Sequence, residues 1–160
     1  MDDIRWLDDQ EMRIWRAFLE AGGRVVHELD QALKCDASMS FDDYEILVFL
    51  SEAADHRLRM SDLSKRLMYS QSRLSQRVDR LVARGWVRRE RCPEDRRGTF
   101  AALTDEGLAA IEAAAPAHLR DVRALLIDVI DPEERAVVAD VLERVATAAR
   151  ERAHDPAPQQ

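Results

Sequence analysis

The sequence predicts a mostly α-helical protein, with two helices joined by a tight turn near its centre and one short β-hairpin after them. Three observations lead to this fold class. Apolar residues recur at helical spacing along most of the 160 residues, glycine and proline are scarce at five each, and only two short runs have the character of strands. With 46% hydrophobic residues, the chain is long enough to bury a core of its own.

The first helix is expected from about Asp8 to Lys34, where apolar side chains recur every three or four positions. Gly22 and Gly23 interrupt this pattern and would allow a bend or a close helix contact. A second helix should begin at Ser40, a favoured N-cap residue followed by two aspartates, and should end near Ala53.

A helix, a tight turn and a second helix are expected next. Ser61 should cap a short helix that ends at Leu67, and a longer helix should follow from Gln71 to Arg84, with Gly85 just beyond its end. The longer helix has an apolar stripe at spacing i, i+4, i+7 that would pack inward: Leu74, Val78 and Leu81. Its opposite face is left free for a partner.

Two strands, Trp86 to Arg91 and Thr99 to Leu103, are expected to form a hairpin around a polar loop. Thr104 should cap the helix that follows. Pro116 should bend or break that helix, because its ring removes a backbone donor and clashes with the preceding turn.

The last helix is expected to start where Asp131, Pro132 and Glu134 combine an N-cap, a favoured first residue and a capping-box acid. It should run to about Arg152. Residues 154–160 are expected to form a disordered tail.

Basic residues are concentrated in one segment of an acidic chain. The net charge is −7, yet residues 57–98 carry 13 Arg or Lys against 5 Asp or Glu, which gives +8 there and −15 elsewhere. One basic surface on an acidic body favours the approach of a polyanion in a single orientation. On charge alone, a solvated basic face without a ligand is an equally good interpretation.

The free face of the longer helix carries side chains suited to DNA bases in the major groove. Arg can bond guanine through two donors, Gln can do the same to adenine, and Ser suits either base. The expected base-reading residues are Ser70, Gln71, Ser72, Arg73, Ser75 and Gln76. Three arginines are better placed for phosphates, which position a protein without specifying sequence: Arg77, Arg80 and Arg84.

The hairpin favours DNA binding over the alternative that these are ordinary surface residues of an amphipathic helix. Its loop holds Arg96 and Arg97 beside Gly98, so it resembles a wing that places guanidinium groups in a narrow, negative minor groove. Asp95 would hold a neighbouring arginine through a charge-assisted hydrogen bond.

The chain resembles the multiple-antibiotic-resistance regulator (MarR) family from roughly Trp15 to Arg150. The resemblance rests on Asp62-Leu63-Ser64 and on the run from Leu74 to Arg89. It also rests on two motifs that follow: an Asp-x-Arg wing motif at Asp95 and Arg97, and a Leu-Thr-x-x-Gly motif at Leu103, Thr104 and Gly107. It implies a bacterial winged helix-turn-helix homodimer that represses genes and releases DNA when it binds a small molecule. It also implies that the first and last two helices form the dimer interface.

Residues 1–39 and 104–153 are therefore expected to form a helical dimerisation region, and residues 40–103 a DNA-binding lobe with a two-stranded wing. Two-fold symmetry predicts a pseudo-palindromic duplex whose half-sites are about 10 to 10.5 bp apart. The apolar residues of the terminal helices also exceed what a small lobe can cover, which favours a dimer: Trp15, Phe18, Leu125, Leu126, Val137, Val138, Val141 and Leu142.

Ligands in this family commonly lie between the DNA-binding lobe and the dimerisation helices. The resemblance therefore implies a small-molecule effector, with aromatic compounds as one candidate class. Its candidate contacts are Trp15, Arg16, Phe18, His27, Phe41 and Tyr44. Aromatic residues at helical spacing are more often core, so a packing role is the alternative for each.

Other function classes have weaker support in the sequence. No catalytic arrangement, cofactor motif or metal-type spacing is present, and no signal peptide or membrane-length apolar run, so a cytoplasmic non-enzyme is expected. Cys92 lies among arginines that favour a thiolate, which makes a thiol-based redox-sensing regulator one alternative; Cys35 is the other thiol. A helical interaction module that does not bind DNA is a further alternative. The operator, the effector and the choice between repression and activation stay open.

Overall fold

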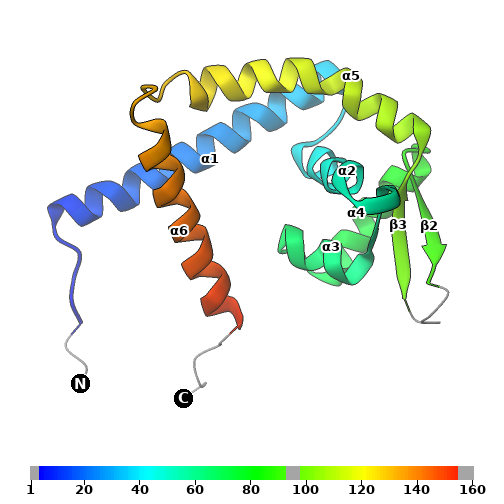
Figure 1. The fold of residues 1–160 in the computed structure, drawn as a ribbon, viewed down its shortest axis with the longest axis horizontal. Helices are drawn as coiled ribbons and strands as arrows, with labels where there is room; N and C mark the ends of the chain where they lie inside the picture. The colour runs from blue at the N-terminus through cyan, green and yellow to red at the C-terminus, as the bar shows by residue number, and fades with distance from the viewer. Residues whose placement is uncertain (1–3, 93–97, 155–160) are drawn as a thin grey trace. The chain divides into compact units, whose positions relative to one another are not determined.

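The computed structural model describes residues 4–92 and 98–154 (Figure 1). The chain divides between Val122 and Arg123 into two compact units. The first unit contains α1 (Asp9–Ala37), α2 (Phe41–Glu52), the 3-10 turn η1 (Ala54–His56), β1 (Arg57–Arg59), α3 (Met60–Leu67), α4 (Gln71–Ala83), β2 (Val87–Arg91), β3 (Thr99–Leu103) and α5 (Asp105–Val122). The second contains the π-helix η2 (Arg123–Ile127) and α6 (Arg135–His154). The fold is therefore mostly helical with a small sheet, as predicted.

A capping box starts α1. The Asp8 carboxylate accepts a hydrogen bond from the backbone N–H of Glu11 at 2.8 Å, and the Glu11 carboxylate accepts one from the N–H of Asp8 at 3.0 Å. The helix then runs as one element through Gly22 and Gly23 to Ala37, so these glycines do not end it. The helix α1 packs with the lobe in one compact unit. The predicted division at residues 39/40 into a dimerisation region and a DNA-binding lobe stays a prediction.

The core of the first unit lies among α2, α3, α4 and the sheet. Burying one leucine or valine side chain contributes about 1.5–3 kcal/mol of stability, so the inward faces of these short helices fix how they pack. The predicted stripe of α4 is fully buried, which confirms its inward orientation. The most deeply buried side chains include Ile46, Leu47, Leu50, Leu63, Leu74, Val78 and Leu81.

The predicted tight turn joins α3 to α4. Met68 takes a left-handed conformation with φ of 54°, and its backbone N–H donates to the last carbonyls of α3. Ser70 then caps α4, because its hydroxyl oxygen accepts a hydrogen bond from the N–H of Arg73 at 3.2 Å. At the far end of α4, Gly85 has a φ of 77°, which only glycine adopts without cost.

The sheet has three antiparallel strands in the order β1-β3-β2. The predicted hairpin is confirmed, with Val87 opposite Leu103. The strand β1 was not predicted. It also makes the prediction for Ser61 wrong: pairing with β3 keeps the chain extended up to Arg59, so α3 begins at once with Met60 and has no side-chain cap.

The helix after the hairpin is longer than predicted. Thr104 caps α5 as expected: its hydroxyl oxygen accepts from the N–H of Gly107 at 3.0 Å and its O–H donates to the carbonyl of Gly85 at 2.7 Å. Pro116 was predicted to bend or break this helix, and it does not break it, since α5 continues to Val122. A proline removes only one backbone donor, and the burial of neighbouring turns of α5 against the core holds the helix together.

The start of α6 also differs from the prediction. Residues 131–134 form a turn in which the N–H of Glu134 donates to the carbonyl of Asp131 at 2.9 Å, and the helix begins only at Arg135. His154 is the last helical residue rather than part of a tail, and residues 155–160 lie outside the described chain. None of the described helices is long and apolar enough to cross a membrane.

Candidate nucleic-acid interface

The exposed face of α4 carries the polar side chains expected to meet DNA bases. Gln71, Ser72 and Gln76 are exposed, and the side chains of the two glutamines make no hydrogen bond within the described residues. Ser70 is occupied as the helix cap, with its hydroxyl 3.1 Å from that of Ser72. The first two turns of α4 therefore present uncommitted donors and acceptors to solvent.

Two arginines of α4 lie against α2 instead. The Arg73 Nη2 atom donates to Asp42 Oδ2 at 2.9 Å, and Arg77 Nη2 reaches the same oxygen at 2.6 Å. Arg77 also donates to the Ser40 hydroxyl at 3.1 Å and approaches Asp43 at 3.4 Å. Arg77, predicted as a phosphate contact, is thus held within the protein and is half-buried.

The other two predicted phosphate contacts differ from each other. Arg80 is exposed and forms no ion pair in the part of the chain that the structure describes. Arg84 donates to the carbonyl of Ser38 at 2.7 Å, and its guanidinium lies 3.6 Å from the centroid of the Trp86 ring. Arg80 is therefore the arginine of α4 that stands available for an anion.

Arg89 joins β2 to α4, a role that the sequence analysis missed. Its guanidinium donates to the Ser75 hydroxyl at 3.0 Å, to the Ser75 carbonyl at 3.2 Å and to Asp79 Oδ1 at 2.9 Å. Ser75 is consequently half-buried and committed. The sequence does place the basic Arg89 in a strand that follows the helix of Asp79. Whether the two residues pair, however, depends on how the hairpin packs against α4.

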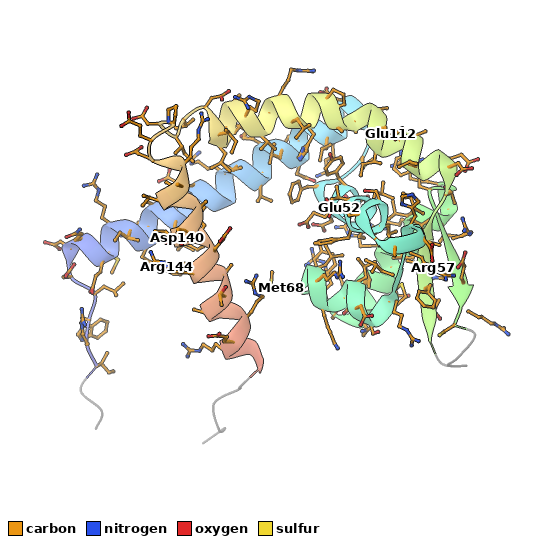
Figure 2. All side chains as sticks on the ribbon, viewed as in Figure 1. Glu52, Arg57, Met68, Glu112, Asp140 and Arg144 are labelled. Atoms are coloured by element: carbon orange, nitrogen blue, oxygen red, sulfur yellow. The ribbon has the colours of Figure 1, made fainter. Side chains whose placement is uncertain are left out.

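A groove of about 610 Å³ runs beside this surface, between the starts of α3 and α4 and the loop end of the hairpin strands. Its polar lining includes Arg59, Ser61, Gln71, Ser72, Ser75 and Arg89. Two arginines of β1 lie over the Phe100 ring of β3. The guanidinium of Arg57 is 5.3 Å from the ring centroid and that of Arg59 is 5.4 Å from it; Arg57 is labelled in Figure 2. The wing residues Asp95, Arg96 and Arg97 lie outside the described residues.

Comparison with known proteins identifies the family. A sequence profile of the MarR family matches residues 37–98. The crystal structure of AbsC, a MarR-family transcriptional regulator from Streptomyces coelicolor, is 41% identical with a TM-score of 0.87, and the match covers 92% of this chain and 99% of that one. The chain belongs to the MarR family.

Two further relatives of this MarR-family chain are informative. Sco3205 from the same organism, solved in complex with DNA, is 41% identical with a TM-score of 0.87, over 92% of both chains. The transcriptional repressor YetL from Bacillus subtilis is 26% identical over 88% of this chain and 85% of its own length. The chain is therefore a transcriptional regulator with a winged helix-turn-helix fold, and it is not an enzyme. This disagrees with the alternative of a helical interaction module that does not bind DNA.

The structure separates the predicted effector residues of this MarR-family chain. Trp15 and Phe18 stack on each other at 6.4 Å between ring centroids, and each is about half exposed on α1. Arg16 and His27 are exposed. Phe41 and Tyr44 instead come together in the lobe. The residues predicted to contact an effector therefore form two separate groups, one exposed on α1 and one in the lobe.

His118 of α5 completes the aromatic cluster around Tyr44. The Tyr44 and His118 ring centroids are 4.4 Å apart, those of Phe41 and His118 are 6.2 Å apart, and the His118 Nδ1 atom is buried without a hydrogen-bond partner. His118 was not among the predicted effector residues, although its spacing from Ile111 and Ala114 places it on the inward face of α5.

The stability of the protein should fall when the pH drops below about 6.5, the ordinary pKa of histidine. Burial lowers the pKa of His118, and the negative charge of Asp121 only partly opposes this. The unfolded chain then binds a proton at a higher pH than the folded one, so stability is lost between that ordinary value and the lowered pKa. His118→Phe keeps a ring beside Tyr44 but cannot take up a proton, so it should make the free energy of unfolding depend less on pH. Urea denaturation between about pH 7.5 and 5 measures this dependence. An unchanged dependence would contradict the role of His118.

Cysteine and metal chemistry gain little support from the structure of this MarR-family chain. Both thiols are free, with Cys35 exposed and Cys92 buried, so an oxidant has restricted access to Cys92. Within residues 4–92 and 98–154, no three His, Cys, Asp or Glu side chains come together in a way that could hold a metal ion.

Proposed function

We propose that this MarR-family regulator binds a duplex DNA operator as a homodimer and represses transcription until a small molecule binds. The observation that carries the proposal is the exposed, uncommitted polar face of α4 above a groove with a polar lining. A helix of this kind fits the major groove with its first turns against the base edges. The DNA complex of the relative Sco3205 and the repressor name of YetL support it, and a cytoplasmic location follows from the same role.

The residues divide into three roles in this proposal. Gln71, Ser72, Arg73 and Gln76 read bases, and Arg80 contacts a phosphate. Ser70 and Ser75 support the helix through the bonds described above. The wing residues Asp95, Arg96 and Arg97 add a minor-groove contact, which their sequence suggests.

Gln76→Ala and Arg80→Ala should weaken DNA binding in different ways. Loss of the Gln76 amide should cost about 1 to 3 kcal/mol at particular base pairs and relax the preference there. Loss of Arg80 should weaken all duplexes alike and make the salt dependence shallower by about one phosphate. Binding to a selected duplex and its single-base variants, at several salt concentrations, measures both effects. Equal weakening of all sequences by Gln76→Ala would mean that Gln76 reads no base.

Exposed apolar side chains on α1 and in the second unit support the homodimer. Surfaces of this kind on one chain are normally covered by a second copy. They include Ile14, Trp15, Phe18 and Leu19 on α1, and Val137, Val141, Leu142 and Val145 on α6. A two-fold dimer would place two α4 helices on half-sites about 10 to 10.5 bp apart.

The cluster of Phe41, Tyr44 and His118 is the best-supported effector site. His118 also lines a cavity of about 270 Å³ between α1 and α5, together with Trp86 and several alanines. The cavity is largely apolar, although Asp36 and Asp121 also line it, and with the unpartnered ring nitrogen of His118 it suits a small aromatic compound that carries a hydrogen-bonding group. Titration calorimetry with such an aromatic compound should give weaker binding to Tyr44→Ala than to Trp15→Ala, and equal binding would point to a different site.

A further inference from the structure

Asp42 stands beside the base-reading surface without belonging to it. It lies in the first turn of α2, which Ser40 caps, and its side chain is 24% exposed. Its Oδ2 atom accepts hydrogen bonds from Arg73 at 2.9 Å and is 2.6 Å from the guanidinium of Arg77. One carboxylate of α2 therefore holds two successive turns of α4.

Tyr69 holds Arg73 from a second direction. The Arg73 guanidinium lies 4.1 Å from the centroid of the Tyr69 ring, and the Tyr69 hydroxyl interacts with the carboxylate of Asp42. Burial and the nearby Asp42 carboxylate raise the pKa of Tyr69, so its hydroxyl stays protonated. Burial of Asp42 acts against its ionisation, but the hydrogen bond from Arg73 and the interaction with Tyr69 lower its pKa overall. The carboxylate, the ring and the guanidinium thus form one ordered group.

A guanidinium held in this way keeps donors for a base. It has five N–H groups in a fixed plane, Asp42 takes one edge, and the Arg73 side chain remains 54% exposed. Two-donor contact with guanine requires that plane to be correctly oriented. A side chain ordered before binding loses less conformational freedom on binding.

We infer that Asp42 is a positioning residue for sequence discrimination: with Tyr69, it fixes the plane of the Arg73 guanidinium so that its free edge faces a base. The inference rests on the proposed base reading by Arg73. A different effect would follow if Asp42 merely neutralised positive charge, because its removal would then strengthen binding to every duplex.

The experiment measures discrimination rather than affinity alone. Its probes are a duplex selected from a random library by the wild-type protein and all single-base-pair variants of that duplex. Asp42→Asn should reduce discrimination at the base pair that Arg73 reads by about 3- to 10-fold, the effect of releasing one long side chain. Asp43→Asn is the matched control, because it changes the same charge in the same turn but touches Arg77 and not Arg73. It should change discrimination by less than about twofold.

Two further variants separate positioning from charge and from misfolding. Asp42→Glu keeps the charge but moves the carboxylate, so it should lose discrimination between base pairs as Asp42→Asn does. It also provides the same test if Asp42→Asn fails to fold. Adding Asp42→Asn to Arg73→Ala should cause no further loss at that base pair. Unchanged discrimination in the Asp42 variants, or uniformly tighter binding to all duplexes, would overturn the inference. If Arg73→Ala itself leaves discrimination intact, the base-reading assignment is what fails.

Discussion

Val141→Asp should convert the protein to a monomer and weaken its binding to a two-site duplex by about 100- to 10,000-fold, the usual gain from bivalent binding. Val141 is 42% exposed on α6 and lies in an apolar stripe with Val137 and Val145. In the proposed homodimer a partner covers this stripe, and a carboxylate buried there without a partner is strongly unfavourable. Valine and aspartate have similar helix propensities, so the helix itself should persist.

Thr147→Asp offers the matched control, because it adds the same charge on the opposite face of α6. Thr147 accepts a hydrogen bond from Arg150 at 2.9 Å, so an aspartate there meets a cation rather than a partner subunit. Sedimentation equilibrium should give a dimer for Thr147→Asp and a monomer for Val141→Asp, and fluorescence anisotropy gives the two affinities. A dimeric Val141→Asp protein with normal DNA binding would place the subunit interface elsewhere.

Gly107→Ala should lower the free energy of unfolding by about 1–3 kcal/mol or more, as overpacking does. By helix propensity alone, the change from glycine to alanine would stabilise the helix by about 1 kcal/mol, so the expected loss of stability comes from packing. A β-carbon at Gly107 would overlap the carbonyl oxygen of Trp86 and press on the Leu103 side chain. Backbone has to move to relieve this contact, which strains the cap that Thr104 forms. The glycine of the Leu-Thr-x-x-Gly motif is therefore required by the close approach of α5 to the hairpin.

Gly22→Ala is the control for this substitution. Gly22 lies inside α1, and a β-carbon there would meet nothing within 4 Å. This change should raise stability by about 0.5–1 kcal/mol. Urea denaturation of both variants measures the difference. A stabilised Gly107→Ala protein would contradict the close approach.

Much of this fold could be predicted because its signals are local. The stripe of Leu74, Val78 and Leu81, the Ser40 cap and the Thr104 cap each depend on residues within two helical turns. The strand β1 has no such signal, since three residues with two arginines become a strand only by pairing with β3. The start of α6 was misplaced because a favourable cap sequence at Asp131 formed a turn instead.

The candidate site was predictable in position but only partly in detail. Which face of α4 is exposed follows from its helical period. Which of its side chains are free does not, because Arg73, Arg77 and Arg84 find partners more than thirty positions away in the sequence. Such contacts depend on the packing of α2 and of the end of α1 against α4. His118 was missed for the same reason, since its neighbours come from another helix.

The two contacts of Arg84 connect the end of α4 to two other elements of the first unit. By gripping the carbonyl at the end of α1 and the ring of Trp86 at once, this side chain fastens the last turn of α4 to the neighbouring helix and to the root of the hairpin. The end of α4 and the end of α1 are thus directly linked, so a displacement of one of these helices would be passed to the other through Arg84. In the proposed homodimer, the separation of the two α4 helices would then depend on the orientation of α1, so a rotation of α1 would change which spacing of half-sites the protein accepts.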